Sequence, residues 1–185
     1  MFGFLPSAQS VSDAAIADTH TFFLDRLRGY LRDSGFLADE IEAVVSQNPS
    51  RMDLVVPRLK AVQAFKKLPE AVALAAANKR ASNILRKEQF LDVRLAKSNL
   101  LIEDAERSLA TTIVLIRGKV DAHFDRSEFV ECLKTLAGLR TTVDAFFDQV
   151  LVNVEDKEVR QNRLALLSEL TYLMNRVADI SKLVA

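Results

Sequence analysis

Residues 69–89 read PEAVALAAANKRASNILRKEQ, the clearest helical pattern in the chain. The stretch is rich in residues that favour helices, and Pro69 suits the first turn, where a missing amide hydrogen costs little. At 3.6 residues per turn, the apolar residues collect on one side and the charged residues on the other. The apolar side consists of Leu74, Ala77, Ala81, Ile84 and Leu85. We therefore predict an amphipathic helix from Pro69 to about Gln89 that packs on a core.

The same apolar spacing continues along most of the chain, which has only five glycines and four prolines. Asp125 followed by Glu128 has the pattern of a capping box and predicts the start of a sixth helix, while Asp156 is expected to cap the last one. Residues 151–156 are expected to form an extended turn, and residues 90–101 are ambiguous. The other predicted helices cover about residues 19–33, 38–46, 51–65, 101–124, 125–150 and 156–182. The expected fold is all-α, an antiparallel bundle of six or seven helices without a sheet.

The length and composition describe one globular domain. The chain has 185 residues, 49% of them hydrophobic, which is enough to bury a core. We expect the domain at residues 19–185, and we expect residues 1–18 to be a flexible arm or a non-native remnant. The single cysteine, Cys132, suits a reducing compartment, and no apolar run is long enough to cross a bilayer, so a cytoplasmic location is expected.

The charge is zero overall but uneven along the chain. Residues 51–97 hold eleven basic and four acidic residues, a net charge of +7, whereas residues 1–50 carry −4 and residues 98–185 carry −3. Within the basic block, five residues fall in an arc of about 120° on the predicted helix. These five residues, called the basic face below, are Lys79, Arg80, Asn83, Arg86 and Lys87.

A row of cations on one helix face is typical of a surface that binds a phosphate backbone, because each neutralised phosphate releases a counterion. An amide such as that of Asn83 can add a hydrogen bond to a base edge or a sugar. We expect an RNA-binding surface here, extended by Arg58, Lys66 and Lys67. The alternative is that the basic face is only solvated, as on many surface helices.

The residue patterns of catalytic and metal sites are missing from the sequence. His20 and His123 are far apart, and no Cys or carboxylate cluster has the spacing of metal ligands. There is no glycine-rich phosphate loop, and Cys132 falls among apolar residues of a predicted helix. We therefore expect no catalytic residue, metal or cofactor in this chain.

Three stretches of the sequence carry specific motifs. They are FFLDRLRGYLRDSGFLADEIEAVV at 22–45, a stretch containing AANKRASNIL at 76–85, and VDAFFDQVLVNVED at 143–156 followed by RQNRLALL at 160–167. These stretches resemble the C-terminal region of bacterial glycyl-tRNA synthetase β subunits. The resemblance covers about residues 19–184, with the poorest match at 86–101. It implies a helical anticodon-binding domain similar to that of arginyl-tRNA synthetases.

The resemblance also implies the partners. They would be glycine tRNA, the α subunit, which would use ATP and glycine for aminoacylation, and the rest of the β subunit. The motif residues carried over are Asn78, Lys79, Arg80, Asn83, Asp144, Phe147, Asp148, Asn153, Glu155, Asp156, Asn162 and Arg163. The four acidic residues among them would repel phosphate, so we expect them in helix caps and internal polar bonds.

Two interpretations remain open at this point. Asn162 and Arg163 are candidates for RNA binding, although Arg163 could instead pair with one of those carboxylates. The whole chain could also be a protein-interaction module that docks on other synthetase domains without touching RNA. An exposed basic face, continuous with Arg58, Lys66 and Lys67, would favour RNA, and a buried or salt-bridged one would favour docking.

Overall fold

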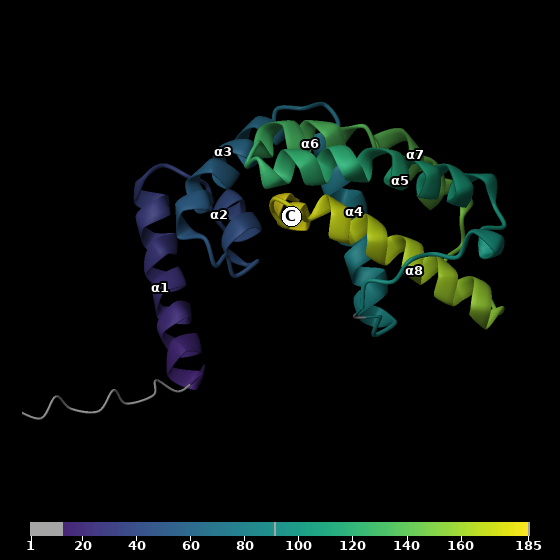
Figure 1. Cartoon of the computed structure of the whole chain (residues 1–185), viewed down its shortest axis with the longest axis horizontal. Helices are drawn as coiled ribbons and strands as arrows, with labels where there is room; N and C mark the ends of the chain where they lie inside the picture. Colours follow the sequence, from purple (N-terminus) through teal and green to yellow (C-terminus); the bar gives the residue numbers. More distant parts are fainter. Residues whose placement is uncertain (1–12, 91, 185) are drawn as a thin grey trace, which may run out of the picture.

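The computed structural model describes residues 13–90 and 92–184 and confirms the all-α prediction (Figure 1). The described part contains eight α-helices, three short 3-10 helices and no strand. The α-helices are α1 Asp13–Asp33, α2 Ala38–Val45, α3 Val55–Phe65, α4 Ala71–Lys87, α5 Asp104–Asp125, α6 Phe129–Ala137, α7 Arg140–Gln149 and α8 Lys157–Met174. The 3-10 helices are η1 Met52–Leu54, η2 Ser98–Leu100 and η3 Ile180–Leu183.

The N-terminal helix α1 is longer than predicted. It begins at Asp13, whereas the sequence analysis placed its start at residue 19. The alanines and other small residues of this region were interpreted as a loose arm, but they simply add turns to the helix. The rest of the predicted arm, residues 1–12, lies outside the described residues.

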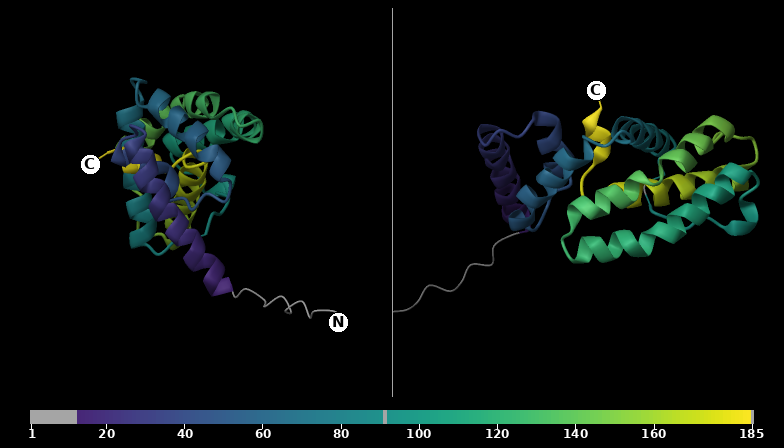
Figure 2. Two further views of the ribbon diagram at one scale, coloured as in Figure 1. Left: turned by 90° about the vertical axis from the view of Figure 1, so that its left-hand side faces the viewer. Right: turned by 90° about the horizontal axis from the view of Figure 1, so that it is seen from above.

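The helices enclose two apolar cores. Helices α4 to α8 surround the larger core, and most residues of α8 are buried. Figure 2 shows α8 running lengthwise between α4 and α5. Helices α1 to α3 enclose a smaller core around Leu31, Ile41 and Leu59. The C-terminal segment joins the two, because the amide of Asp179 donates to the carbonyl of Ala43 at 2.6 Å and Leu183 packs against both cores. The C-terminal residues and the packing of α3 against α6 therefore both hold the bundle and the three N-terminal helices together.

The predicted sixth helix is wrong in both its start and its continuity. Asp125 is the last residue of α5 rather than a cap, and Ser127 takes a left-handed φ of 57°, which breaks the helix. The side chain of Glu128 bonds to His123 and Arg126 instead of closing a capping box. The predicted helix is also divided into α6 and α7 at Gly138, and the chain turns there so that Leu139 enters the core.

The last helix also ends earlier than predicted, at Met174 instead of about Lys182. The chain then turns at Asn175, whose side-chain oxygen accepts a hydrogen bond from Asn78 at 2.8 Å. It continues into η3, which packs against α4. This turn brings the C-terminal residues to the helix that carries the basic face.

The predicted cap at Asp156 is confirmed, and it yields a measurable expectation. Its Oδ1 accepts from the backbone amides of Glu158 at 2.9 Å and Val159 at 3.1 Å. Asp156→Ala should lower the free energy of unfolding by about 1 kcal/mol, the usual effect of losing such a cap. Urea denaturation would measure the change, and Asp156→Asn, which keeps an acceptor oxygen, should cost less. Equal losses in the two variants would contradict the capping role.

Candidate nucleic-acid interface

Helix α4 is amphipathic, as predicted. Its apolar side, with Leu74, Ala77, Ala81 and Leu85, is buried against α7, α8 and η3. The motif residue Asn78 lies on this buried side and bonds to Asn175, so it has a structural role. Burying one side in this way fixes the helix and turns the other side to solvent.

The basic face lies on that solvent side. Arg80, Asn83, Arg86 and Lys87 are exposed, and Lys79 is half-buried. Within residues 13–90 and 92–184, none of the four cations forms a salt bridge with a carboxylate, although many other arginines and lysines do. Their positive charge is therefore not neutralised by the described part of the chain.

Weak local contacts order the basic face. The guanidinium of Arg80 lies over the ring of Phe147, 4.5 Å from its centroid. Arg86 donates to Oδ1 of Asn83 at 2.8 Å, and Lys79 donates to the carbonyl of Val184 at 3.2 Å. A shallow hollow of about 560 Å³ lies among Lys79, Arg80, Asn83 and Lys87. The face thus offers cations, an amide and a concave surface to a ligand.

A structural reason for some of these cations also exists. Arg86 and Lys87 are in the last turn of α4, where a positive charge stabilises the partial negative charge of a helix C-terminus. That effect does not apply to Lys79 and Arg80, which lie near the middle of the helix. Stabilisation of the helix end therefore accounts for only half of the cations.

The predicted extension of the basic face is wrong for Arg58 and Lys66. The guanidinium of Arg58 lies 5.4 Å from the ring centroids of both Phe124 and Phe129. Burial, together with the nearby Arg176, lowers the pKa of Arg58. Arg58 is therefore half-buried against aromatic rings rather than free beside the basic face.

Lys66 is neutralised by two carboxylates. Its ammonium lies 2.7 Å from a carboxylate oxygen of Asp39 and 3.3 Å from one of Glu40. Burial works to lower the pKa of Lys66, but its bonds to these carboxylates raise it. Of the three predicted neighbours, only Lys67 is exposed without an ion pair in the described part.

Asn162 and Arg163 are also corrected, because both are buried within the bundle. Asn162 exchanges two hydrogen bonds with the backbone of Lys97, and Arg163 is 4% exposed. The Nε of Arg163 donates to Glu106 at 2.9 Å, and its Nη1 donates to the carbonyl of Leu151 at 2.6 Å. Neither side chain is available to RNA, and the partner of Arg163 is none of the carboxylates considered from the sequence.

The acidic motif residues have mixed roles. Asp156 caps α8, and Asp144 pairs with Arg140 at 2.8 Å, which agrees with the expected structural roles. Asp148 and Glu155 are exposed and make no such bond within the described residues. Their place in the motif has no explanation in the contacts of this chain.

The sequence analysis missed the exposed cations of the segment that follows α4. Arg94 and Lys97 belong to the basic block but lie in an extended segment, where helical periodicity gives no signal. Lys182 was missed as well, and it is exposed on η3, which packs against α4. Of the three, Lys182 lies on an element that packs against α4, so it adds positive charge near the basic face.

The described residues bear on the expectations about metal sites, Cys132 and membrane-spanning helices. No group of three His, Cys, Asp or Glu residues there could hold a metal ion. Burial raises the pKa of the Cys132 thiol to about 11, so it stays protonated and packs as an apolar side chain. None of the described helices combines the length and the apolarity needed to cross a bilayer.

The comparisons with known proteins show the family of the chain. Residues 74–180, which include all of the basic face, match the DALR anticodon binding domain family. The glycine–tRNA ligase β subunit of Ralstonia nicotianae is 55% identical over 172 residues, 93% of this chain and 24% of that protein. The glycine–tRNA ligase β subunit of Thiobacillus denitrificans is 46% identical over 96% of this chain and 25% of that protein. The glycine–tRNA ligase β subunit of Dechloromonas aromatica is 49% identical over 94% of this chain and 24% of that protein. The chain spans about a quarter of the length of these relatives.

Proposed function

The chain belongs to the DALR anticodon-binding domain family, and we propose that it binds the anticodon arm of glycine tRNA through the basic face of α4. The observation that carries the proposal is the set of four cations on one helix side without a carboxylate partner in the described part. Cations that have no carboxylate partner and share one helix side can each bind a phosphate of an RNA backbone. The choice of glycine tRNA as the proposed ligand rests on the names of the relatives.

In this proposal the domain supplies RNA binding and another chain supplies the chemistry. The ATP-dependent attachment of glycine would take place on an α subunit, with the remainder of a β subunit joining the two. The role of this domain would be to hold the anticodon arm so that the acceptor end of the same tRNA reaches that site.

A second candidate function is supported by helix α1. Its side chains Ile16, Phe22, Phe23 and Tyr30 are all more than half exposed. Exposed apolar side chains of this size often mark a protein interface. We propose that α1 docks on another protein surface, such as the remainder of the β subunit. This contact is compatible with RNA binding, because it uses a different helix from the basic face.

The proposed function is tested with the unmodified chain. Its affinity for glycine tRNA should exceed its affinity for an unrelated tRNA, and both should fall as salt rises. Asn83→Ala should reduce the preference for glycine tRNA by roughly 1–3 kcal/mol if the amide contacts a base. Lys119→Ala, on the exposed surface of α5, is the matched control and should leave the preference unchanged. Failure of the unmodified chain to bind either tRNA would contradict the proposal.

A further inference from the structure

Residues 92–97, which lie between α4 and η2, form an extended segment on the surface of α8. The amide of Arg94 donates to Oγ of Ser168 at 3.1 Å, and the amide of Ala96 donates to Glu169 at 2.7 Å. The amide of Lys97 donates to Oδ1 of Asn162 at 2.6 Å, and Asn162 returns a bond to the Lys97 carbonyl at 3.0 Å. Three buried polar side chains of one helix therefore fix a segment that has no helix or strand of its own.

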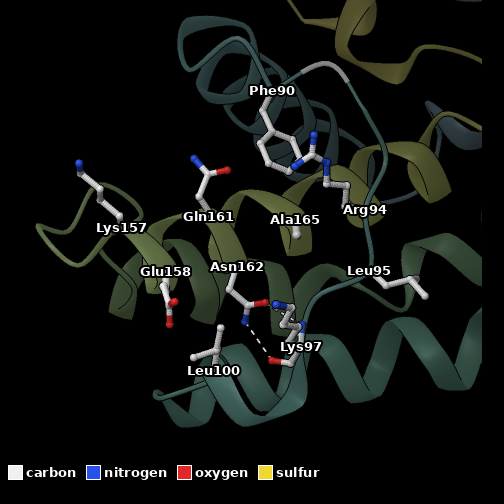
Figure 3. A pocket seen from close by; sticks show the side chains of 10 residues that line it. All are labelled: Phe90, Arg94, Leu95, Lys97, Leu100, Lys157, Glu158, Gln161, Asn162 and Ala165. Atoms are coloured by element: carbon white, nitrogen blue, oxygen red, sulfur yellow. Dashed lines mark hydrogen bonds between the residues drawn. The ribbon is translucent and has the colours of Figure 1, made fainter.

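A hollow of about 340 Å³ lies beside this segment (Figure 3). Phe90 and Arg94 form one side, Lys97 and Leu100 lie on the other, and Ala165 of α8 lies between them. A volume of this size suits a small organic group. Because α8 and the bonded segment form its walls, the hollow is built into the fold.

The side chains around the hollow combine a flat aromatic surface with positive charge. The guanidinium of Arg94 lies over the ring of Phe90, 5.1 Å from its centroid. Gln161 is exposed, and its amide makes no hydrogen bond within the described residues. Lys97 and Lys157 also line the hollow and have no ion pair there.

Two carboxylates oppose these charges. Asp92 pairs with Arg94 at 3.2 Å, and Glu158 lies at the edge of the hollow. With three cations against two carboxylates, the local charge is still positive. The surroundings therefore favour a planar group attached to a negatively charged backbone over an aliphatic side chain or an acidic peptide without rings.

The hollow begins just beyond the C-terminal end of α4. Gln89 takes a left-handed φ of 53°, and the amide of Phe90 donates to the carbonyl of Leu85 at 2.9 Å. This helix-ending turn places the Phe90 ring three residues after Lys87. The hollow is therefore one short turn of chain away from the helix that carries the basic face.

We propose that the hollow binds one unpaired nucleobase of the RNA held by α4. The base stacks against Phe90 and Arg94, Gln161 bonds to its edge, and Lys97 and Lys157 neutralise the adjoining phosphates. Stacking on aromatic rings and guanidinium planes is how proteins hold the splayed bases of single-stranded RNA loops. The inference rests on the proposed function, since it requires that α4 binds the anticodon arm.

The test uses the full chain and the anticodon stem-loop of glycine tRNA, with each loop nucleotide made abasic in turn. One abasic position should weaken binding by the unmodified chain about tenfold, as expected for the loss of one stacked base. Phe90→Leu, which keeps an apolar side chain, should weaken the intact stem-loop by a similar factor. In that variant the same abasic change should have no further effect, because the base has already lost its ring partner.

Two further variants keep the result interpretable. Gln161→Ala changes an exposed side chain that needs no partner for folding. It should weaken binding of the intact stem-loop less than Phe90→Leu does. With the stem-loop that lacks the same base, Gln161→Ala should bind as tightly as the unmodified chain. Phe23→Leu makes the same substitution on α1, away from the hollow, and should bind every RNA as the unmodified chain does.

The hollow is ruled out as a base site if Phe90→Leu and Gln161→Ala bind the intact stem-loop normally. It is also ruled out if each of the two substitutions weakens binding by the same factor for every abasic stem-loop, so that no single base position cancels its effect. In either case the basic face could still be the RNA surface, and a loss of binding on replacing its cations would show this. If the unmodified chain binds no stem-loop, both proposals are wrong.

Discussion

Arg163→Met is expected to lower the free energy of unfolding by about 3–5 kcal/mol, the usual cost of leaving a buried charge without its partner. The partner is Glu106, whose side chain is completely buried and lies 2.9 Å from Nε of Arg163. The same carboxylate accepts from the amides of Ile102 and Glu103, so it cannot move out to solvent without breaking the start of α5. The change should therefore loosen the contact between α5 and α8.

Denaturant unfolding followed by circular dichroism would measure this effect. The double variant Glu106→Gln with Arg163→Met should recover more than half of the lost stability, because the glutamine oxygen still accepts from the backbone while the buried charge is gone. Arg160→Met on the same helix is the matched control, since Arg160 has no ion pair in the described part. A loss below about 1 kcal/mol for Arg163→Met would show that the pair is solvated rather than buried.

The second large effect is expected in RNA binding. Replacing Lys79, Arg80, Arg86 and Lys87 together by alanine should weaken binding to glycine tRNA about 1,000-fold at 0.1 M salt. Each phosphate contact changes the slope of log affinity against log salt by roughly 0.7–0.9, so four contacts are worth about three orders of magnitude between 1 M and 0.1 M. The difference between the variant and the unmodified chain should accordingly vanish near 1 M salt.

The fold should survive these four substitutions, because the apolar side of α4 is unchanged and alanine favours a helix. Circular dichroism and the unfolding midpoint provide the folding control. A matched variant with Lys60, Lys119, Arg126 and Lys134 replaced by alanine removes the same charge from exposed positions outside α4. If the two variants lose the same affinity, the effect comes from net charge and the basic face has no special role.

The sequence predicted the face of α4 because helix geometry alone fixes which residues share a side. The angle between Lys79 and Lys87 depends only on the number of residues between them, and packing did not alter it. The cap at Asp156 could be predicted for the same reason, because a cap involves only the next three residues.

The partners of individual charges could not be predicted in this way. Lys66 bonds to Asp39, which is 27 residues away, and Arg163 bonds to Glu106, which is 57 residues away. Such pairs depend on how the helices pack, and neither composition nor periodicity contains that information. The expected extension of the basic face through Arg58 and Lys66 therefore depended on packing that the charge count of residues 51–97 does not contain.

The hollow beside α8 was missed for a related reason. Its segment is extended but belongs to no sheet, and side chains of Asn162, Ser168 and Glu169 hold it in place. In the sequence, Asn162 stood out only as a motif residue that could touch RNA. In the structure, Asn162 bonds to the backbone of Lys97 and so fixes the segment that carries Arg94 and Lys97.

The central claim, that the basic face contacts tRNA, is tested most directly by lysine footprinting of the unmodified chain. Brief acetylation would be measured at each lysine by mass spectrometry, with and without saturating glycine tRNA. Lys79 and Lys87 should be protected severalfold by the tRNA, while Lys119 and Lys134 should react as before. Unchanged acetylation of Lys79 and Lys87 in a sample where the tRNA is bound would show that RNA binds elsewhere and would contradict the account.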